Sequence, residues 1–342
     1  MSTDKSDKSD KTKPNRGVGL DLGTMNIVSA RSRSGKVDFS RIRDAFLDLD
    51  ISAKKMLKLS GVSYIERGEN IVVIGDAAME MANVFGREAR RPLSRGLVAA
   101  GEVEALEVLG VMVKNVLGAP VEPNEVCYFC VPAAPVDEDR DVVYHRGVFE
   151  RIVTECGFKA ISSNEAMAII YSETANEGFS GLAISFGSGM CNVALAVNGI
   201  EGFSFSVARG GDWIDEGAAR AVGSTRSRIC ALKEKGFDLL APVGREQEAL
   251  ALYYKSLIEY ALECTAREFL RIKDKFSLPK AVPLVVSGGT SLPTNFVPFL
   301  TSVWSRMKKK FPLEVSEVRH ASDPMNAVAR GLLVLALQEY DD

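Results

Sequence analysis

Apolar residues alternate with polar or glycine positions near the start of the chain and return after a short break: Val18, Leu20, Leu22, Ile27 and Val28. The break is Gly23-Thr24, and Asp21 lies on the opposite face of the first apolar run. A strand, a glycine turn and a second strand predict a β-hairpin over residues 17–29.

The same layout occurs a second time in residues 181–197, where an apolar strand, the turn Gly187-Ser188-Gly189 and another apolar strand follow one another. A third glycine turn, residues 287–291, comes directly after the apolar run 283–286. Two similar hairpins, one in each half of the chain, predict a duplicated fold whose halves face each other across a cleft.

The remaining pattern predicts alternating strands and helices, as expected of an α/β protein. The predicted strands cover residues 34–46, 62–66, 71–76, 126–132, 157–161 and 313–315. The predicted helices cover residues 103–117, a segment with an acidic start at 137–139, then 164–171, 246–276, 296–309 and 324–337.

Composition changes this picture little. A chain of 342 residues exceeds the usual size of one core, so two or more subdomains are expected. The net charge of -3 and the absence of a long basic run argue against nucleic acid as a direct partner. We interpret Lys308-Lys309-Lys310 as a solvated helix end.

The first sixteen residues mix both charge signs and hold no apolar residue after Met1, which predicts a disordered tail. They lack the apolar core of a signal peptide, and no later apolar run is long enough to span a bilayer. We therefore expect a cytoplasmic protein, and nothing in the sequence supports membrane contact.

Cysteine and histidine give no clear metal site. Cys127 and Cys130 lie three residues apart in a predicted buried strand, where their side chains point to opposite faces, so a zinc knuckle is not favoured. We interpret His145 and His320 as surface or helix-flank residues.

The chemistry of the first turn suits an anion. Its backbone N–H groups and the Thr24 hydroxyl can donate to phosphate oxygens, while Asp21 stands where a hydrated divalent cation could be held. For the first hairpin alone an ordinary turn is the favoured interpretation, and the repeated layout is what favours the phosphate site.

Several segments resemble motifs of the actin, heat-shock chaperone ATPase and sugar kinase superfamily. D-L-G-T-M-N at 21–26 resembles the first phosphate motif, S-F-G-S-G-M-C-N at 185–192 the second, and V-V-S-G-G-T-S-L at 285–292 the adenosine motif. The segments 164–171 and 323–331 resemble the two connecting helices, and R-G-G-D-W-I-D at 209–215 the turn after the second hairpin. Within the superfamily, the sequence is most similar to prokaryotic actins of the MreB and MamK type.

This resemblance implies an α/β, actin-like fold: duplicated ribonuclease-H-like halves around a nucleotide cleft, each with a small inserted subdomain. The implied divisions are a tail at 1–16, a first large subdomain at 17–46, 90–164 and 323–342, a first small insertion at 47–89, a second large subdomain at 165–211 and 281–322, and a second small insertion at 212–280.

The resemblance also implies a site for ATP or ADP with Mg²⁺. The implied nucleotide-binding residues are Gly23, Thr24, Met25, Asn26, Gly187, Ser188, Gly189, Gly210, Gly211, Asp212, Lys233, Gly288, Gly289, Thr290 and Ser291. Asp21 would hold Mg²⁺ through water and Glu165 would orient or activate the attacking water.

Two of these roles have plain alternatives. A carboxylate at the start of a helix, such as Glu165, is also stabilised by the helix dipole alone. Lys233 belongs to a segment whose basic or acidic side chains touch the nucleoside in bacterial actins, but a solvated helix face explains it equally well.

The departures from the family pattern concern hydrolysis. Ser185 stands where the family usually has an aspartate, Asn192 replaces a frequent acid or histidine, and Met190 and Cys191 replace hydroxyl or small residues. Hydroxyl and amide groups supply hydrogen bonds without charge. The sequence therefore predicts nucleotide binding with slow hydrolysis.

The function implied is that of a filament protein: ATP binding in the cleft, closure of the halves, head-to-tail assembly with other copies, and hydrolysis that permits turnover. An unknown adaptor or cargo protein is a further expected partner. A chaperone ATPase would need a substrate-binding domain after the last helix, and a sugar kinase usually has larger insertions. A nucleotide-binding scaffold that does not polymerise stays an alternative, favoured by Ser185 and Met190.

Overall fold

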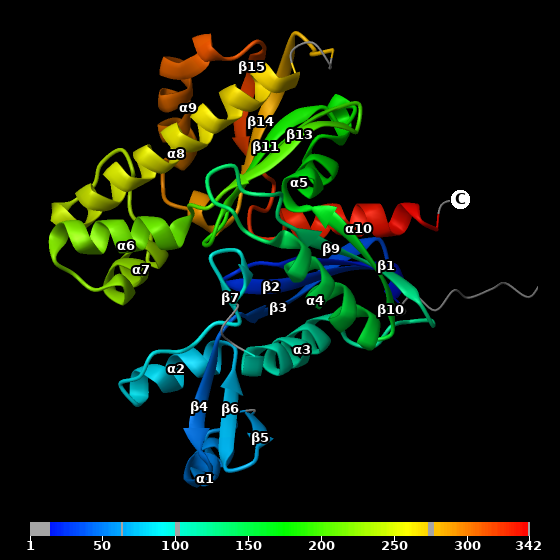
Figure 1. The fold of residues 1–342 in the computed structure, drawn as a ribbon, viewed down its shortest axis with the longest axis vertical. Coiled ribbons are helices and arrows are strands. Elements are labelled where there is room, and N and C mark those ends of the chain that lie inside the picture. The colour runs from blue at the N-terminus through cyan, green and yellow to red at the C-terminus, as the bar shows by residue number, and fades with distance from the viewer. Residues whose placement is uncertain (1–13, 63, 100–102, 273–276, 341–342) are drawn as a thin grey trace, which may run out of the picture.

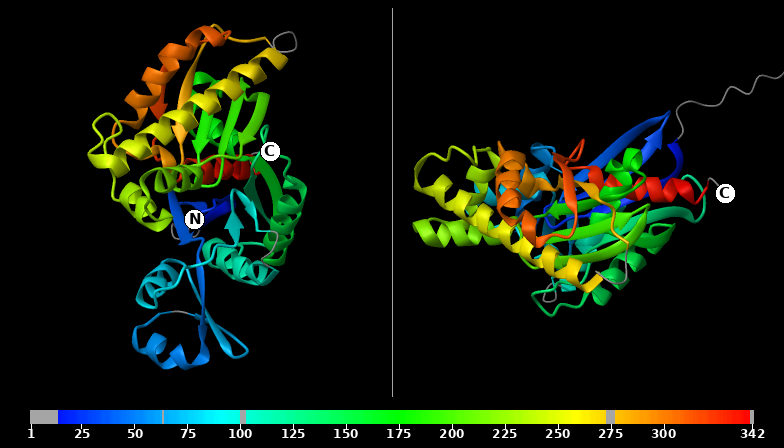
Figure 2. Two further views of the ribbon diagram at one scale, coloured as in Figure 1. Left: turned by 60° about the vertical axis from the view of Figure 1, so that its left-hand side comes forward. Right: turned by 90° about the horizontal axis from the view of Figure 1, so that it is seen from above.

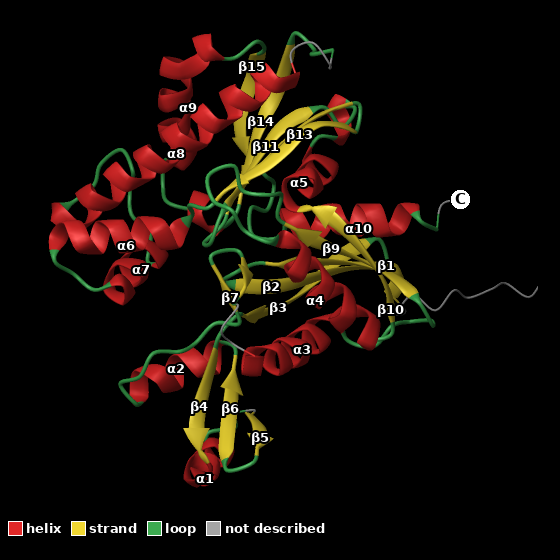
Figure 3. Ribbon diagram, in the orientation of Figure 1, coloured by secondary structure: helices red, strands yellow, loops and turns green. Residues whose placement is uncertain are grey.

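The computed structural model describes residues 14–62, 64–99, 103–272 and 277–340. Two five-stranded sheets, each with helices against it, occupy the middle and upper parts of the view (Figure 1; Figure 3). The predicted tail lies almost entirely outside the described residues.

The first sheet has the strand order β10-β9-β1-β2-β3. Its strands are β1 (Pro14–Leu22), β2 (Asn26–Arg33), β3 (Lys36–Arg43), β9 (Glu125–Val131) and β10 (Phe158–Asn164). The predicted first hairpin is β1 and β2, which pair antiparallel, while β1, β9 and β10 run parallel. The helices α3 (Val103–Leu117) and α4 (Val142–Glu155) pack against this sheet.

The second sheet repeats this arrangement with the order β13-β12-β11-β14-β15. Its strands are β11 (Gly181–Phe186), β12 (Cys191–Val197), β13 (Ile200–Val207), β14 (Ala281–Ser287) and β15 (Glu314–His320). Here β11 and β12 form the second predicted hairpin, and β11 runs parallel to β14. The duplicated topology confirms the predicted fold class.

Two helices connect the halves. The helices α5 (Glu165–Glu173) and α10 (Ala327–Gln338) pack against each other, α5 also against the second sheet and α10 against the first. Figure 2 shows α10 lying between the two parts of the molecule. Both helices are strongly apolar, because each is covered on more than one side.

A small insertion follows β3 and forms a sheet of its own in the order β4-β6-β5. It consists of β4 (Phe46–Asp50), α1 (Lys54–Leu59), β5 (Tyr64–Arg67), β6 (Asn70–Ile74) and α2 (Asp76–Val84). A short hairpin, β7 (Leu93–Ser94) and β8 (Leu97–Val98), leads back toward the first sheet. The insertion has its own buried cluster around Leu47, Leu57 and Ile71.

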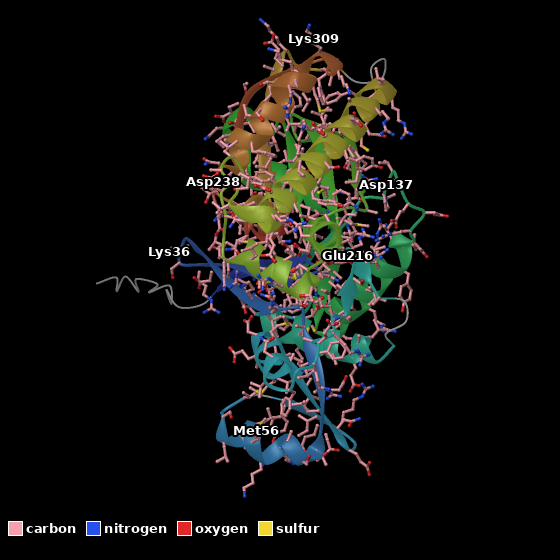
Figure 4. The ribbon with its side chains drawn as sticks, turned by 90° about the vertical axis from the view of Figure 1, so that its left-hand side faces the viewer. Lys36, Met56, Asp137, Glu216, Asp238 and Lys309 are labelled. Carbon is pink, nitrogen blue, oxygen red and sulfur yellow. The ribbon has the colours of Figure 1, made fainter. Side chains whose placement is uncertain are left out.

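The second half carries a helical insertion with one long helix, followed by a further helix. The helices are α6 (Gly211–Val222), α7 (Arg226–Glu234), α8 (Gly244–Ile272) and α9 (Phe296–Met307). Figure 4 labels Met56 of α1 at one end of the molecule and Lys309, just after α9, at the other. The subdomain boundaries given above stay a prediction.

Some local predictions are wrong. The acidic residues 137–139 precede α4, which begins at Val142 because the Asp141 carboxylate accepts from the N–H groups of Val143 and Tyr144. The predicted end of the long helix at residues 273–276 lies outside the described residues, and α10 begins at Ala327, three residues later than predicted.

The interpretation of His145 as a surface or helix-flank residue is also wrong. His145 is buried in α4, its Nδ1 accepts from the Val98 N–H at 3.3 Å, and burial lowers its pKa to about 4. His320 is half-buried at the end of β15 and stacks on Phe296. No helix in the described part of the chain is long and apolar enough to cross a membrane.

Candidate functional site

A cavity of about 400 Å³ lies between the two halves, and all three glycine turns reach it. Of the residues predicted from the sequence, those that line this cavity are Asp21, Gly23, Thr24, Met25, Asn26, Glu165, Gly187, Ser188, Gly189, Lys233, Gly288, Gly289 and Thr290. The fold therefore brings together residues from strands that are more than 250 positions apart in the chain.

The first turn requires glycine at position 23, because a side chain there would collide with the backbone. A Cβ atom on Gly23 would lie 2.8 Å from the carbonyl oxygen of Asn26. Thr24 is buried, and its hydroxyl oxygen accepts from the Gly96 N–H at 3.1 Å, which fixes the turn against the short β7-β8 hairpin. The Asp44 N–H donates to the Met25 carbonyl at 2.9 Å and anchors the turn from the other side.

The second turn is held by its own backbone and by the third turn. The Gly187 N–H donates to the Met190 carbonyl at 3.0 Å, while the Gly187 carbonyl accepts from the Thr290 hydroxyl at 3.0 Å. A Cβ on Gly189 would lie 2.1 Å from the backbone nitrogen of Gly96. Both hairpin turns therefore meet the same backbone segment at the cavity wall.

Four predicted binding residues do not line the cavity: Gly210, Gly211, Asp212 and Ser291. Gly210 and Gly211 pack behind the second turn, where a Cβ on Gly210 would lie 2.5 Å from the Ser188 carbonyl oxygen. Asp212 pairs with Arg91 at 3.2 Å and with Arg226 at 2.8 Å. The Ser291 hydroxyl donates to the Gly288 carbonyl. Their contacts hold the turns in place.

Asp21 and Glu165 supply the carboxylates of the cavity. Burial raises the pKa of Asp21 to about 6, although a hydrogen bond from the Cys130 thiol at 3.3 Å opposes this rise. Burial and the nearby charge of Asp21 raise the pKa of Glu165 to about 8. Two half-buried carboxylates that disfavour each other's ionisation form a site that a cation would stabilise.

The Glu165 carboxylate is held by two donors from the second hairpin. The Ser185 hydroxyl donates to Oε1 at 2.6 Å and the Asn192 side-chain amide donates to Oε2 at 2.8 Å. Asn164 caps the helix that begins at Glu165, accepting from the N–H groups of Ala166 and Met167. Backbone and side chain of Glu165 are thus both fixed.

The residues present fit a nucleotide with Mg²⁺. The hydroxyl of Ser188, in the second turn, is buried without a hydrogen-bond partner among the described residues. Buried hydroxyls usually have a partner, so this one is available to donate to a bound anion. No cluster of three or more His, Cys, Asp or Glu side chains suited to direct metal binding occurs within the described ranges. A single carboxylate such as Asp21 suits Mg²⁺ that keeps its waters and binds phosphate.

Near α7 the cavity is lined by side chains of both signs. The Lys233 ammonium donates to the Gly211 carbonyl at 3.2 Å and pairs with the buried Asp215 at 2.8 Å. Glu234 pairs with Arg43 of the first sheet at 2.8 Å. Lys233 thus lines the cavity and does not lie on a purely solvated helix face.

Sequence reasoning missed several lining residues: Arg41, Arg43, Asp76, Gly96, Glu234 and Met325. Glu234 is adjacent to Lys233 in the segment that resembles the nucleoside-contacting segment of bacterial actins, so the sequence did indicate this region. Arg41 and Arg43 are two apart on β3, which places them on one face, but nothing local shows that this face meets the cavity.

Comparison with solved structures finds the same fold in prokaryotic actin-like proteins. The MamK double helical filament is 19% identical, with a TM-score of 0.67 over 94% of this chain and 98% of that chain. MreB 5 of Spiroplasma citri bound to AMPPNP is 16% identical, with a TM-score of 0.65 over 96% and 98%. Ethanolamine utilization protein EutJ from Carboxydothermus hydrogenoformans is 16% identical, with a TM-score of 0.54 over 95% and 91%. These likenesses establish the actin-like fold.

Comparison with curated protein sequences finds no match. A family profile described as Volactin matches residues 17–336, which span both sheets, both insertions and all three glycine turns. The chain therefore belongs to the Volactin family.

Proposed function

We propose that this protein is an actin-like filament protein that binds ATP with Mg²⁺ between its halves, polymerises head to tail and hydrolyses ATP slowly. The observation that carries the proposal is the convergence of all three glycine turns, Asp21 and Glu165 on one cavity. Solved structures of the same fold include MreB 5 bound to AMPPNP and MreB5 bound to ADP.

In this proposal the two hairpin turns hold the phosphates through backbone N–H groups, with the hydroxyls of Thr24 and Ser188 beside them. Gly288 and Gly289 would contact the adenosine from one side, and Lys233 and Glu234 would also contact it. Asp21 would hold Mg²⁺ through water, and the metal, when bound, neutralises charge on the phosphates. Glu165 would accept a hydrogen bond from the attacking water.

The raised pKa of Glu165 supports slow hydrolysis. A carboxyl with a pKa of about 8 is mostly protonated at neutral pH in the ligand-free protein, and a protonated carboxyl is a poor proton acceptor. Ser185 adds no negative charge at the position where the family usually has an aspartate. Substituting Asp for Ser185 would place a carboxylate where Glu165 now receives a hydrogen bond.

Self-assembly is proposed from the fold. One MamK structure is a double helical filament, and another is a non-polymerising mutant bound to AMPPNP, so nucleotide binding and assembly are separable in that protein. We propose the four-subdomain division given above, a head-to-tail homopolymer in the cytoplasm and an adaptor or cargo protein as a further partner.

A nucleotide-binding scaffold without turnover is a second candidate, and the raised pKa of Glu165 favours it. In that case bound ATP would fix the relative position of the two halves and would dissociate without being hydrolysed. Filament turnover coupled to phosphate release would argue against this candidate.

The proposal is tested by sedimentation and negative-stain microscopy with ATP, ADP, a non-hydrolysable analogue or no nucleotide, with phosphate release measured in parallel. We expect nucleotide-dependent filaments and slow phosphate release. Glu165→Gln should retain filaments and reduce the rate of release by about 10²-fold or more. Absence of polymer under every condition would contradict the filament proposal, and sugar-dependent ADP formation would point to a kinase.

A further inference from the structure

Ser185 and Asn192 hold the two oxygens of one half-buried carboxylate, that of Glu165, at 2.6 Å and 2.8 Å. The two side chains are partners across the antiparallel strands β11 and β12, so they lie side by side on one face of the second sheet. Each of the two residues is only 2% exposed. A rigid hairpin thus presents two donors to one side chain.

We propose that Ser185 and Asn192 are positioning residues, here named the Ser185–Asn192 clamp, which fixes the Glu165 carboxylate for its reaction with water. This inference rests on the proposed ATP hydrolysis. The clamp acts through Glu165 and need not touch the nucleotide. A carboxylate oxygen has more than one lone pair, so a clamped Glu165 can still accept a hydrogen bond from water.

The orientation of the Asn192 amide supports a donor role. With Nδ2 donating to Glu165, the Oδ1 atom of Asn192 is buried and has no hydrogen-bond partner among the described residues. Leaving a buried amide oxygen unpaired is unfavourable. With Glu165 ionised, the reversed amide would be worse, because Oδ1 would then face an acceptor. The Glu165 carboxylate therefore sets the orientation of the Asn192 amide.

Both donors are uncharged, so they add no negative charge next to the carboxylates of Asp21 and Glu165. The carboxylates of Asp21 and Glu165 already disfavour each other's ionisation in the buried site. An acid at either clamp position would add a third carboxyl and remove a donor. Donors favour the ionised form of the carboxylate they contact, and the Ser185 hydrogen bond opposes the rise in the pKa of Glu165. The clamp thus both orients Glu165 and favours its basic form.

The test compares Ser185→Ala, which removes the donor to Oε1, and Asn192→Leu, which removes the donor to Oε2, with the wild type. We expect the affinity for ATP to change by less than about threefold, whereas the single-turnover rate of phosphate release falls by about tenfold to hundredfold, as for a misplaced catalytic group. The rise of this rate with pH should move to higher pH in Ser185→Ala. Ser185→Thr, which keeps a hydroxyl, should restore much of the rate.

Ser204→Ala is the matched control. Ser204 lies on β13 of the same sheet, and its hydroxyl donates to Glu201 at 2.6 Å, a hydrogen bond of equal length at an exposed site that does not line the cavity. This variant should release phosphate at the wild-type rate. Thermal melting of all variants reports whether they fold.

A second readout needs no nucleotide. The ¹³C NMR signal of the Glu165 carboxyl carbon, assigned by its loss in Glu165→Gln, should titrate at higher pH in Ser185→Ala than in the wild type. Wild-type rates of release in both clamp variants, or an unchanged Glu165 titration, would overturn the clamp. A wild type that binds ATP but releases no phosphate would instead refute the proposed hydrolysis, and the NMR titration then decides whether the clamp favours the ionised form.

Discussion

Asp44 shows at the scale of one residue how the fold sets a charge state. Asp44 joins β3 to β4 and is 1% exposed. Its Oδ2 accepts from the Leu93 N–H at 3.0 Å, while Oδ1 has no partner among the described residues. Burial raises the pKa of Asp44 to about 8, against the opposing effects of the Leu93 N–H and the Arg91 charge. The folded protein therefore keeps this carboxyl protonated through neutral pH.

This raised pKa has a defined effect on stability. An unfolded chain releases the Asp44 proton near pH 3.8, whereas the folded protein retains it up to about pH 8. The folded state binds more protons between these values, so the free energy of unfolding falls as the pH rises through this window. The slope from one such group approaches about 1.4 kcal/mol per pH unit.

Asp44→Asn should therefore flatten the dependence of stability on pH. Asn cannot ionise, so the contribution of Asp44 to the slope is lost, while those of Asp21 and Glu165 remain. Urea unfolding at several pH values between about 5 and 8 measures the difference. Asp38→Asn, at a carboxylate that is 57% exposed, serves as the control. An equally steep curve for Asp44→Asn and the wild type would contradict this account of Asp44.

At the scale of elements, α10 joins the halves through contacts that only glycine permits. A Cβ on Gly331 would lie 1.7 Å from the Ala168 carbonyl oxygen of α5. On the other side of α10, a Cβ on Gly19 of β1 would lie 2.1 Å from the Ala329 carbonyl oxygen. The backbone of α10 thus lies directly against β1 and α5. Glycine at position 331 closes one of the connecting-helix motifs seen in the sequence, and the close approach explains it.

Gly331→Ala should force α10 and α5 apart and lower the free energy of unfolding by about 1–3 kcal/mol or more. Gly147→Ala on α4 is the matched control, because a Cβ there meets no atom within 4 Å. Alanine is the better helix former, so this control should gain about 0.5–1 kcal/mol. Thermal and urea unfolding distinguish the two effects. Equal stability of both variants would show that α10 can shift without lowering the free energy of unfolding.

At the scale of the whole molecule, ion pairs join the two halves. Arg43 of β3 pairs with Glu234 of α7 at 2.8 Å, and Arg91 pairs with Asp212 of α6 at 3.2 Å. Arg43 and Glu234 both line the cavity, so their pairing spans its edge. We expect a nucleotide that enters or leaves the cleft to pass where these side chains meet.

Arg43→Gln should accelerate nucleotide release by about fivefold, the equivalent of about 1 kcal/mol for a partly exposed ion pair. Stopped-flow displacement of a fluorescent ATP analogue measures the rate. Added salt should accelerate release from the wild type more than from the variant. Lys310→Gln is the control, since Lys310 pairs with Glu263 within the second half at 3.3 Å. Identical release rates in wild type and Arg43→Gln would rule out a barrier at this pair.

Features that depend on neighbouring residues could be predicted from the amino-acid sequence. The alternation of apolar residues and the glycine turns after Leu22 and Phe186 define two hairpins, because turn geometry acts over a few residues. The order of the motifs also indicated an actin-like fold, and most of the residues expected to bind nucleotide do line one cavity.

Which side chains meet depends on the packing of the whole fold. Ser185 and Asn192 contact Glu165 from 20 and 27 positions away, and Arg43 reaches Glu234 over 191 positions. His145 is buried and its Nδ1 accepts from the Val98 N–H of the β7-β8 hairpin, a contact that no pattern within α4 reveals. Such contacts depend on how sheets and helices pack. Packing also determines how deeply each side chain is buried, which charge state it has and which hydrogen-bond partners it finds. The chain alone thus specifies the turns, while the packed fold specifies the chemical state of the carboxylates between them.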